Sequence, residues 1–258
     1  MTLLQGRIIC ITGASRGIGR GCAVECAKNG AKGLILHYYG DEATQAEIDA
    51  LAIEIKTSYG SEVVTVPGDI ALYETSLKIV AEGVKAFDRI DALVSNAGIC
   101  PFSEFLTMDI ETWHRTRQVN LDGAFYITQA RQMKEQTPQG GSIIGISSIS
   151  ALVGGGQQVH YTPTKAGILS LMQSTAVALG KYSIRANAIL PGTIMTDINK
   201  EDLSDLEKKT GMEKRTCLGR LGQPDDIAGP VVFLVSDLAK YVTGASLLVD
   251  GGLFVNLQ

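Results

Sequence analysis

Residues 7–29 read RIICITGASRGIGRGCAVECAKN, and this stretch decides the fold that we expect. Residues 7–12 form a short, largely apolar run typical of a buried strand, and a segment of helical period follows from Gly17. Between them lies a turn with Gly13, Gly17 and Gly19. Glycines permit a tight turn and close approach to the backbone, and a helix N-terminus attracts a pyrophosphate. We therefore predict a dinucleotide-binding unit, although a three-glycine turn alone could be an ordinary loop.

Short apolar runs alternate with segments of helical period along the whole chain. The expected strands are 7–12, 33–37, 62–67, 92–96, 142–146, 185–190 and 246–250. The expected helices are 17–29, 41–59, 73–87, 108–134, 161–180 and 224–238. Repeated strand–helix–strand units require a parallel sheet with right-handed crossovers and helices on both faces. We predict an α/β fold in one domain over residues 1–258: a doubly wound, Rossmann-type, seven-stranded parallel sheet.

The composition excludes several classes of protein. The 23 Lys and Arg against 27 Asp and Glu give a net charge of −4, and without a basic run we expect no nucleic-acid partner. We expect no membrane span, because no apolar stretch reaches about 18 residues, and the first residues lack a signal-peptide layout. Five scattered cysteines without a CxxC motif predict neither disulfides nor a metal site. We therefore expect a cytoplasmic protein.

The segment 193–221 interrupts this alternation. It reads TIMTDINKEDLSDLEKKTGMEKRTCLGRL, is highly charged, and directly follows a strand end. One interpretation is a solvated pair of surface helices. The other is a mobile substrate lid over a site at the carboxyl ends of the strands, where open α/β sheets bind ligands.

The end of the second strand bears on cofactor choice. NAD normally calls for an acidic residue there to bind the ribose hydroxyls. Residues 37–40 read HYYG instead, and the first acids are Asp41 and Glu42. Arg16, in the glycine turn, could reach a 2′-phosphate. The choice between NAD and NADP stays open, and use of both is plausible.

Further motifs give this chain a family resemblance. The ordered set is SNAG at 95–98, Asn120, Ser148, YTPTK at 161–165 and Pro-Gly at 191–192. Together with the glycine turn, it resembles the short-chain dehydrogenase/reductase family over essentially the whole chain. SNAG replaces the usual NNAG and YTPTK the usual YSASK, and Pro163 fits a first helical turn. The stretches 141–155, 160–176 and 248–258 are similar to fungal L-rhamnose 1-dehydrogenases.

The chemistry of these residue types supports catalysis. Oxidation of a sugar hemiacetal needs a base, and Tyr161 would need its pKa lowered from about 10 by about three units, roughly 4 kcal/mol. One cation at about 4 Å and an effective dielectric near 20 supplies roughly 4 kcal/mol, and Lys165 lies at i+4 on the same expected helix face. Ser148 would donate a hydrogen bond to the substrate oxygen. Its neighbour Ser147 would face the other way. The resemblance implies that Asn120 holds a water linked to Lys165; alternatively, backbone groups satisfy its amide.

The resemblance also implies binding residues. The catalytic set is Asn120, Ser148, Tyr161 and Lys165. The cofactor set is Gly13, Ser15, Arg16, Gly17, Ile18, Gly19, Tyr38, Asp69, Ile70, Asn96, Ala97, Gly98, Tyr161, Lys165, Ile194 and Thr196. Asp69 is alternatively a helix cap. The substrate candidates are Ser148, Ser150, Gln158, Tyr161 and Thr193, with Cys100 and His160 nearby. His160 is expected at the surface rather than in catalysis.

These residues predict an enzyme that oxidises an aldose, such as L-rhamnose, at its C1 hydroxyl to the lactone with NAD or NADP. The alternative in the same family is a 3-oxoacyl-carrier-protein reductase or a generic carbonyl reductase. An alternative of another class is a non-catalytic nucleotide-binding scaffold, which would not need Tyr161 and Lys165. Apolar residues around much of 161–180 predict a second protein surface, and the family implies a homotetramer.

Overall fold

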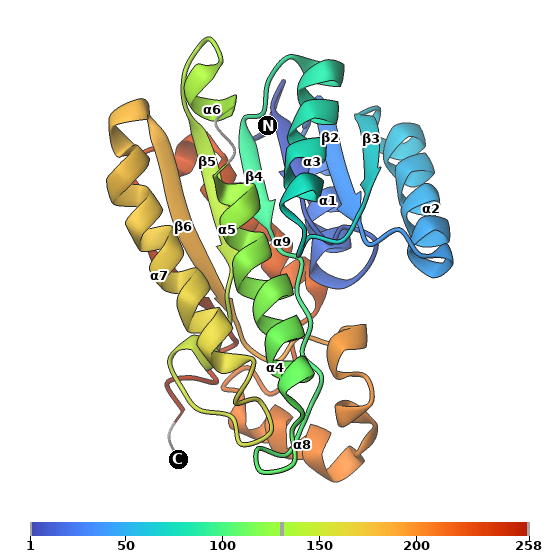
Figure 1. Ribbon diagram of the computed structural model, residues 1–258, viewed down its shortest axis with the longest axis vertical. Coiled ribbons are helices and arrows are strands. Elements are labelled where there is room, and N and C mark those ends of the chain that lie inside the picture. Colours follow the sequence, from blue (N-terminus) through green and yellow to red (C-terminus); the bar gives the residue numbers. More distant parts are fainter. Residues whose placement is uncertain (1, 130–131, 257–258) are drawn as a thin grey trace.

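The computed structural model describes residues 2–129 and 132–256. Seven strands form one parallel sheet in the order β3-β2-β1-β4-β5-β6-β7 (Figure 1). They are β1 Ile8–Ile11, β2 Gly33–Tyr38, β3 Glu62–Pro67, β4 Ala92–Ser95, β5 Gly141–Ile146, β6 Ile184–Pro191 and β7 Ser246–Val249. The predicted α/β class and seven-stranded parallel sheet are confirmed. The order reverses between β1 and β4, and such a point is where open sheets bind ligands.

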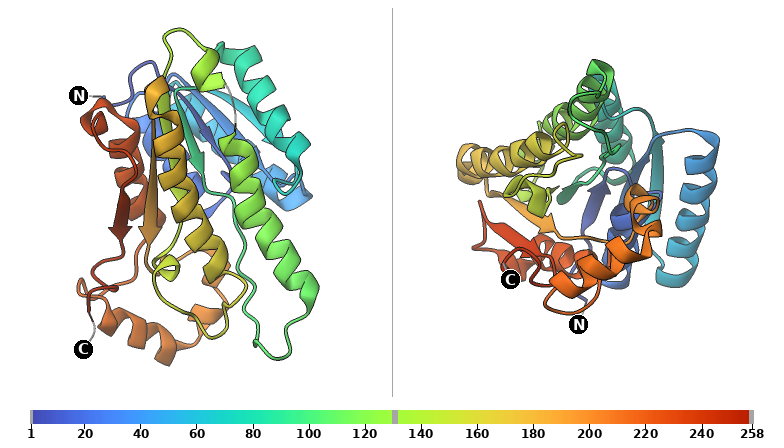
Figure 2. Two further views of the ribbon diagram at one scale, coloured as in Figure 1. Left: turned by 60° about the vertical axis from the view of Figure 1, so that its left-hand side comes forward. Right: turned by 90° about the horizontal axis from the view of Figure 1, so that it is seen from below.

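Helices cover both faces of the sheet, as Figure 2 shows from below. The main helices are α1 Gly17–Lys28, α2 Glu42–Tyr59, α3 Tyr73–Phe87, α4 Ile110–Arg117, α5 Gly123–Thr128, α7 Thr162–Leu179 and α9 Pro224–Val235. Successive strand side chains point to opposite faces. Thus Ile9 and Ile11 of β1 pack in a cluster with α1, α2 and α9, whereas Ile8 and Cys10 pack in a second cluster with α3, α5 and α7. The sheet is therefore buried on both sides, which explains its continuous apolar strands.

The prediction of one helix over 108–134 is wrong. Asp109 caps α4 by accepting a hydrogen bond from the Thr112 N–H, and one π-helical turn, Gln118–Asp122, separates α4 from α5. A short helix, α6 Gln132–Glu135, follows, and residues 130–131 of the prediction lie outside the described residues. The wider turn contains Asn120, so the interruption coincides with a predicted functional residue.

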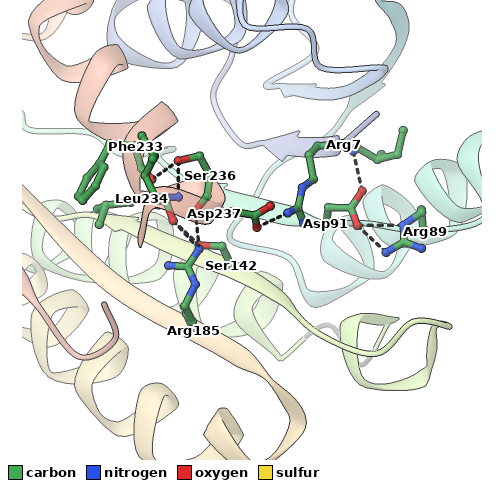
Figure 3. Close-up of polar contacts among 11 residues, drawn as sticks. Arg7, Arg89, Asp91, Ser142, Arg185, Phe233, Leu234, Ser236 and Asp237 are labelled. Atoms are coloured by element: carbon green, nitrogen blue, oxygen red, sulfur yellow. Dashed lines mark hydrogen bonds and ion pairs between the residues drawn. The ribbon is translucent and has the colours of Figure 1, made fainter. Parts of the chain in front are cut away.

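A polar network ties elements together at the amino ends of the strands (Figure 3). Asp91, before β4, accepts hydrogen bonds from the Ile8 N–H at 2.8 Å and from the Arg89 Nη2 at 2.6 Å. Arg185 of β6 and Ser142 of β5 both donate to the Leu234 carbonyl of α9, at 2.7 and 3.0 Å. These contacts hold β1, β4, β5 and β6 together at their amino ends, away from the glycine turn.

The segment 193–221 extends beyond the carboxyl ends of the strands, with α8 Leu206–Arg215 at the lower end of Figure 1. Short 3-10 turns, Asp197–Asn199 and Asp202–Ser204, precede α8. Within the described ranges, no helix is both long enough and apolar enough to span a membrane.

Candidate functional site

A cavity of about 800 Å³ lies at the carboxyl ends of the strands and gathers most of the predicted site residues. Its lining includes Gly13, Ser15, Arg16, Gly17, Ile18, Asp69, Ile70, Asn96, Ala97, Gly98, Cys100, Ser148, Ser150, Gln158, Tyr161, Lys165, Thr193, Ile194 and Thr196. Gly19, Tyr38, Asn120 and His160 were also singled out from the sequence, but they do not line it. The volume suits an extended ligand rather than a single ion.

The glycine turn has the backbone that its sequence requires. Gly13 and Gly17 have φ of 65° and 56°, in the left-handed region that glycine tolerates. A Cβ on Gly19 would lie 2.1 Å from the Gly13 carbonyl oxygen. Gly19 thus permits the close packing of α1 against the turn and does not face the cavity. The turn leaves the N-terminus of α1 directed at the cavity, where a dinucleotide pyrophosphate fits.

Asn96 joins the end of β4 to this turn. Its Nδ2 donates to the carbonyls of Thr12 and Gly13 at 2.9 and 3.0 Å, and its backbone N–H donates to the Thr12 hydroxyl at 2.9 Å. The Asn96 amide nitrogen is therefore engaged by the turn itself. Asn96 positions the ligand-binding backbone, in addition to lining the cavity where an adenine ribose was expected.

His37 joins the turn to the loop after β3. Its Nδ1 accepts a hydrogen bond from the Gly13 N–H at 3.2 Å, so Nε2 carries the proton and donates to the Gly68 carbonyl at 2.9 Å. The ring is 2 % exposed, and burial lowers its pKa to about 4. His37 is therefore neutral near pH 7.

Tyr38 was predicted to contact the cofactor, but its side chain does not line the cavity, whereas that of Tyr39 does. β2 extends through Tyr38, whose side chain is buried in the core with α1 and α2 and donates from its hydroxyl to Gln45 Oε1. Side chains alternate along a strand, so the next residue faces the other way. Tyr39 is 55 % exposed and lines the cavity.

Asp69 lines the cavity but does not cap α3. Its Oδ2 pairs with Arg115 Nη1 at 2.7 Å, and its Oδ1 accepts from the Ala71 N–H at 3.0 Å. The residue at the N-cap of α3 is Leu72, without a side-chain cap. Arg115, which also lines the cavity, was missed from the sequence because its partner lies 46 residues away.

Two adjacent serines follow the end of β5, and both line the cavity, although Ser147 was expected to face the other way; their hydroxyls have different partners. Ser147 Oγ donates to the Lys165 carbonyl at 2.7 Å and so anchors the first turn of α7. Ser148 Oγ accepts from the Ser150 N–H at 3.1 Å and lies close enough to the Tyr161 hydroxyl to lower its pKa. Ser148 is thus the serine that adjoins the tyrosine hydroxyl.

Tyr161, which is half-buried, lies next to Lys165, which is buried. The Lys165 Nζ lies 5.4 Å from the centre of the Tyr161 ring and donates to the Ile146 carbonyl at 2.9 Å. Burial raises the pKa of Tyr161, and the Ser148 hydroxyl offsets only part of this. Burial also lowers the pKa of Lys165 to about 8. The expected lowering of the tyrosine pKa by Lys165 is therefore absent from the protein alone, where loss of hydration is the larger effect.

Asn120 lies next to this pair without reaching the cavity. Its Oδ1 accepts from the Ile99 N–H at 2.8 Å, while its Nδ2 donates to the Ile99 carbonyl at 2.9 Å and to Thr164 Oγ1 at 3.2 Å. The alternative in which neighbouring groups satisfy its amide describes this geometry. Asn120 holds the β4–α4 loop against α7.

The expectation of a surface His160 is wrong: it is fully buried, and neither ring nitrogen has a hydrogen-bond partner among the described residues. Near it, Cys100 accepts from Gln158 Nε2 at 3.2 Å. Cys100 and Gln158 line the cavity close to Tyr161, where a substrate would lie.

The sequence did not predict the residues through which the 193–221 segment meets the β4–α4 loop in the cavity wall. Asp202 and Lys208 form an ion pair, and the Lys208 Nζ lies 5.6 Å from the centre of the Phe102 ring. All three line the cavity, with Met212 of α8. In the part of the chain that the structure describes, no cluster of three or more His, Cys, Asp or Glu could hold a metal ion.

Comparison with known proteins places this geometry in context. The sequence family described as enoyl-(acyl carrier protein) reductase matches residues 13–254. The chain is 59 % identical to an L-rhamnose 1-dehydrogenase (NAD(P)(+)) of Azotobacter vinelandii, over 99 % of this chain and 100 % of that one. It is 58 % identical to an L-rhamnose-1-dehydrogenase of Scheffersomyces stipitis, over 99 % of both chains. A gluconate 5-dehydrogenase of Burkholderia cenocepacia, solved with NADP and tartrate, has a TM-score of 0.90 at 31 % identity, covering 98 % of this chain and 96 % of that one.

The burial of neutral His37 predicts a specific loss of stability in acid. Its pKa is 6.5 when exposed and about 4 in the fold, so the unfolded chain binds the extra proton over this range. The contribution of neutral His37 to the free energy of unfolding is complete above pH 6.5. It falls by up to about 3 kcal/mol as the pH drops to 4. Urea unfolding at pH 7, 5 and 4 should show a smaller loss for His37→Gln than for the wild type. Equal losses in the two proteins would contradict this role.

Proposed function

Because this chain belongs to the short-chain dehydrogenase/reductase family, we propose that it oxidises an aldose, with L-rhamnose as the first candidate, at the C1 hydroxyl to the lactone. The observation that carries the proposal is one continuous cavity, with a dinucleotide-type glycine turn at one end and Ser148, Tyr161 and Lys165 at the other. The 59 % identity to an L-rhamnose 1-dehydrogenase supports the choice of sugar.

NAD or NADP is the cofactor in this proposal, and the residues present fit it. The positive φ of Gly13 and Gly17 lets the backbone approach a pyrophosphate closely. Ile194 and Thr196, which also line the cavity, would hold the nicotinamide end. When bound, the oxidised dinucleotide accepts a hydride from C1 of the sugar.

The catalytic proposal assigns one task to each buried polar group. Ser148 donates a hydrogen bond to the C1 oxygen, and Tyr161 takes the hydroxyl proton. Lys165 is the cation next to Tyr161, and its pKa of about 8 lets it exchange a proton close to neutral pH. Tyr161 deprotonates only if additional positive charge offsets its burial, and a cationic nicotinamide ring would supply that charge. Asn120 keeps the β4–α4 loop against α7, so its role is positioning.

A second candidate is reduction of a 3-oxoacyl thioester or another carbonyl by the same residues in reverse. Only the substrate wall separates the two activities. An absorbance assay at about 340 nm, the nicotinamide band, with L-rhamnose, L-lyxose, L-mannose and an acetoacetyl thioester distinguishes them. A non-catalytic scaffold is disfavoured, because burying the Lys165 ammonium next to Tyr161 has an energetic cost that a scaffold has no reason to retain.

The segment 193–221 is the substrate lid of a domain that spans residues 1–258. Lys208 reaches the β4–α4 loop, where its Nζ lies over the Phe102 ring, and an ion pair with Asp202 inside the segment positions the Lys208 side chain. Thr193 Oγ1 also lies 3.8 Å from Met212 Sδ, which joins the start of the segment to α8. Closure over the sugar would exclude water and add Ser150, Gln158 and Thr193 to the substrate contacts.

The chain also assembles as a homotetramer in this proposal and works in the cytoplasm. Val177 on α7 is 87 % exposed and Phe125 on α5 is 47 % exposed, although both helices pack on the sheet through other residues. Apolar side chains on the outer faces of neighbouring helices fit a self-complementary interface. At the C-terminus, Val255 is exposed while Phe254 is half-buried, and Leu257 lies outside the described residues. The free thiols fit a reducing compartment.

Replacing the proposed base tests the mechanism. Tyr161→Phe should lower kcat for L-rhamnose by at least about a hundredfold, because the proton acceptor is lost. The Kd of NADP should change little. Tyr59→Phe on α2, away from the cavity, serves as the matched control and should keep full activity. Near-wild-type turnover in Tyr161→Phe would exclude this mechanism.

Breaking the lid contact should affect the sugar rather than the cofactor. Asp202→Asn removes the ion pair with Lys208, and loss of a charged hydrogen bond predicts a KM for the sugar raised by about tenfold or more. The Kd of NADP should stay within about twofold. Glu201→Gln, its exposed neighbour, is the control. A KM unchanged by Asp202→Asn would show that the segment does not act as a lid.

Sedimentation equilibrium at micromolar concentration tests assembly. The expected species has four chains of 27.4 kDa. Val177→Glu, which places a charge on the outer face of α7, should shift the distribution toward smaller species. A fully active species of single-chain mass would rule the tetramer out.

A further inference from the structure

We propose that Glu47 sets the balance between NAD and NADP by holding the guanidinium of Arg16 in an ion pair beside the place of the adenosine ribose. The inference rests on the proposed dinucleotide site and specifies its phosphate selectivity. Arg16 is the N-cap residue of α1 and lines the cavity together with Tyr39 and Thr44. It is therefore the cation at the end of the cavity that faces β2.

Arg16 is already engaged in the ligand-free protein. Its Nε donates to Glu47 Oε2 at 2.9 Å, with the two side chains 42 % and 37 % exposed. Arg16 also contributes to lowering the pKa of the Asp41 carboxyl, after the larger effect of hydrogen bonds from Thr44. Glu47 therefore occupies one edge of the Arg16 guanidinium before any phosphate arrives, and the Asp41 carboxylate adds a weaker interaction with the same charge.

Glu47 acts through Arg16 rather than as a wall of the cavity. Glu47 and Asp41 are not among the lining residues, whereas Arg16 and the exposed Tyr39 are. The carboxylate that commonly binds both ribose hydroxyls at the end of the second strand is replaced here by the aromatic ring of Tyr39. The phosphate selectivity of this end is therefore set by how free the Arg16 charge is.

The consequence differs for the two dinucleotides. A 2′-phosphate carries about −1.5 to −2 charges at neutral pH, so it competes with Glu47 for Arg16 and is repelled by both carboxylates. A ribose with a free 2′-hydroxyl carries no such charge and leaves the ion pair intact. The ion pair lowers the affinity for NADP below the value expected if Arg16 had no carboxylate partner. It leaves the affinity for NAD unchanged, so the two affinities become more similar.

The chain contains a matched control. Arg20, one turn along α1, pairs with Glu54, two turns along α2, at 2.5 Å. This second ion pair joins the same two helices with the same residue types, and neither residue lines the cavity. Any general effect of loosening α1 from α2 should therefore appear equally in Glu54→Gln.

Calorimetric titration of the full-length protein with adenosine 2′,5′-bisphosphate and with adenosine 5′-monophosphate isolates the phosphate term without nicotinamide or sugar. Glu47→Gln should bind the bisphosphate about threefold to tenfold more tightly, the range expected for releasing a partly exposed ion pair and removing a nearby charge. Binding of the monophosphate should stay within about twofold. The gain should shrink in about 0.5 M salt, where charges are screened. Glu54→Gln should change neither ligand.

Two further variants fix the interpretation. Asp41→Asn, which keeps a good helix cap, should give a gain in the same direction. In an Arg16→Met background, the gain from Glu47→Gln should fall to less than half, because the residue acts through the arginine. Unchanged or weaker bisphosphate binding by Glu47→Gln would overturn the proposal and identify Glu47 as a residue that aligns Arg16 for phosphate. Failure of the wild type to bind either nucleotide would instead remove the dinucleotide site, and this inference with it.

Discussion

The contact between the glycine turn and the end of β4 is the constraint on which the site depends. Strand order reverses between β1 and β4, so the helices that follow them diverge to opposite faces and leave a crevice. Asn96 closes the base of that crevice by bonding the carbonyls of Thr12 and Gly13. A Cβ on Gly13 would come within 2.9 Å of Ala97 Cα, so this approach requires glycine. His37 bonds to the turn from the other side, so protein groups hold the turn on both sides.

The charged groups at the two ends of the cavity differ in how far they are exposed to water. At the β2 end, Arg16 and its carboxylate partners are partly exposed, so their interactions are modest and depend on salt. At the α7 end, Lys165 is buried and Tyr161 half-buried, and loss of hydration is the largest effect on the pKa of each. The groups that select a charged ligand therefore lie where salt and water weaken their interactions. The groups that transfer a proton lie where water is scarce.

Much of this organisation is readable from the sequence, because strands buried on both faces must be apolar throughout and appear as short runs. The residues that resisted prediction depend on contacts between distant segments. The π-helical turn at Asn120 is sustained by Ile99 and Thr164, 21 and 44 positions away. β2 runs through Tyr38, one residue farther than predicted. Because side chains alternate along a strand, Tyr38 faces the core and Tyr39 lies at the cavity. Lys208 could not be predicted as part of the cavity wall because its contact, Phe102, lies in a distant segment of the chain.

The amino-terminal network of Asp91, Arg185 and Ser142 separates what stabilises the sheet from what selects the ligand (Figure 3). These bonds lie at the far end of the strands from the cavity, so they hold the sheet without involving the loops that form the substrate wall. Insertions and replacements in those loops are therefore tolerated by the fold. This division favours the evolution of new activities. Loop residues can be exchanged for ones that bind a new substrate, while the contacts at the amino ends of the strands keep their register.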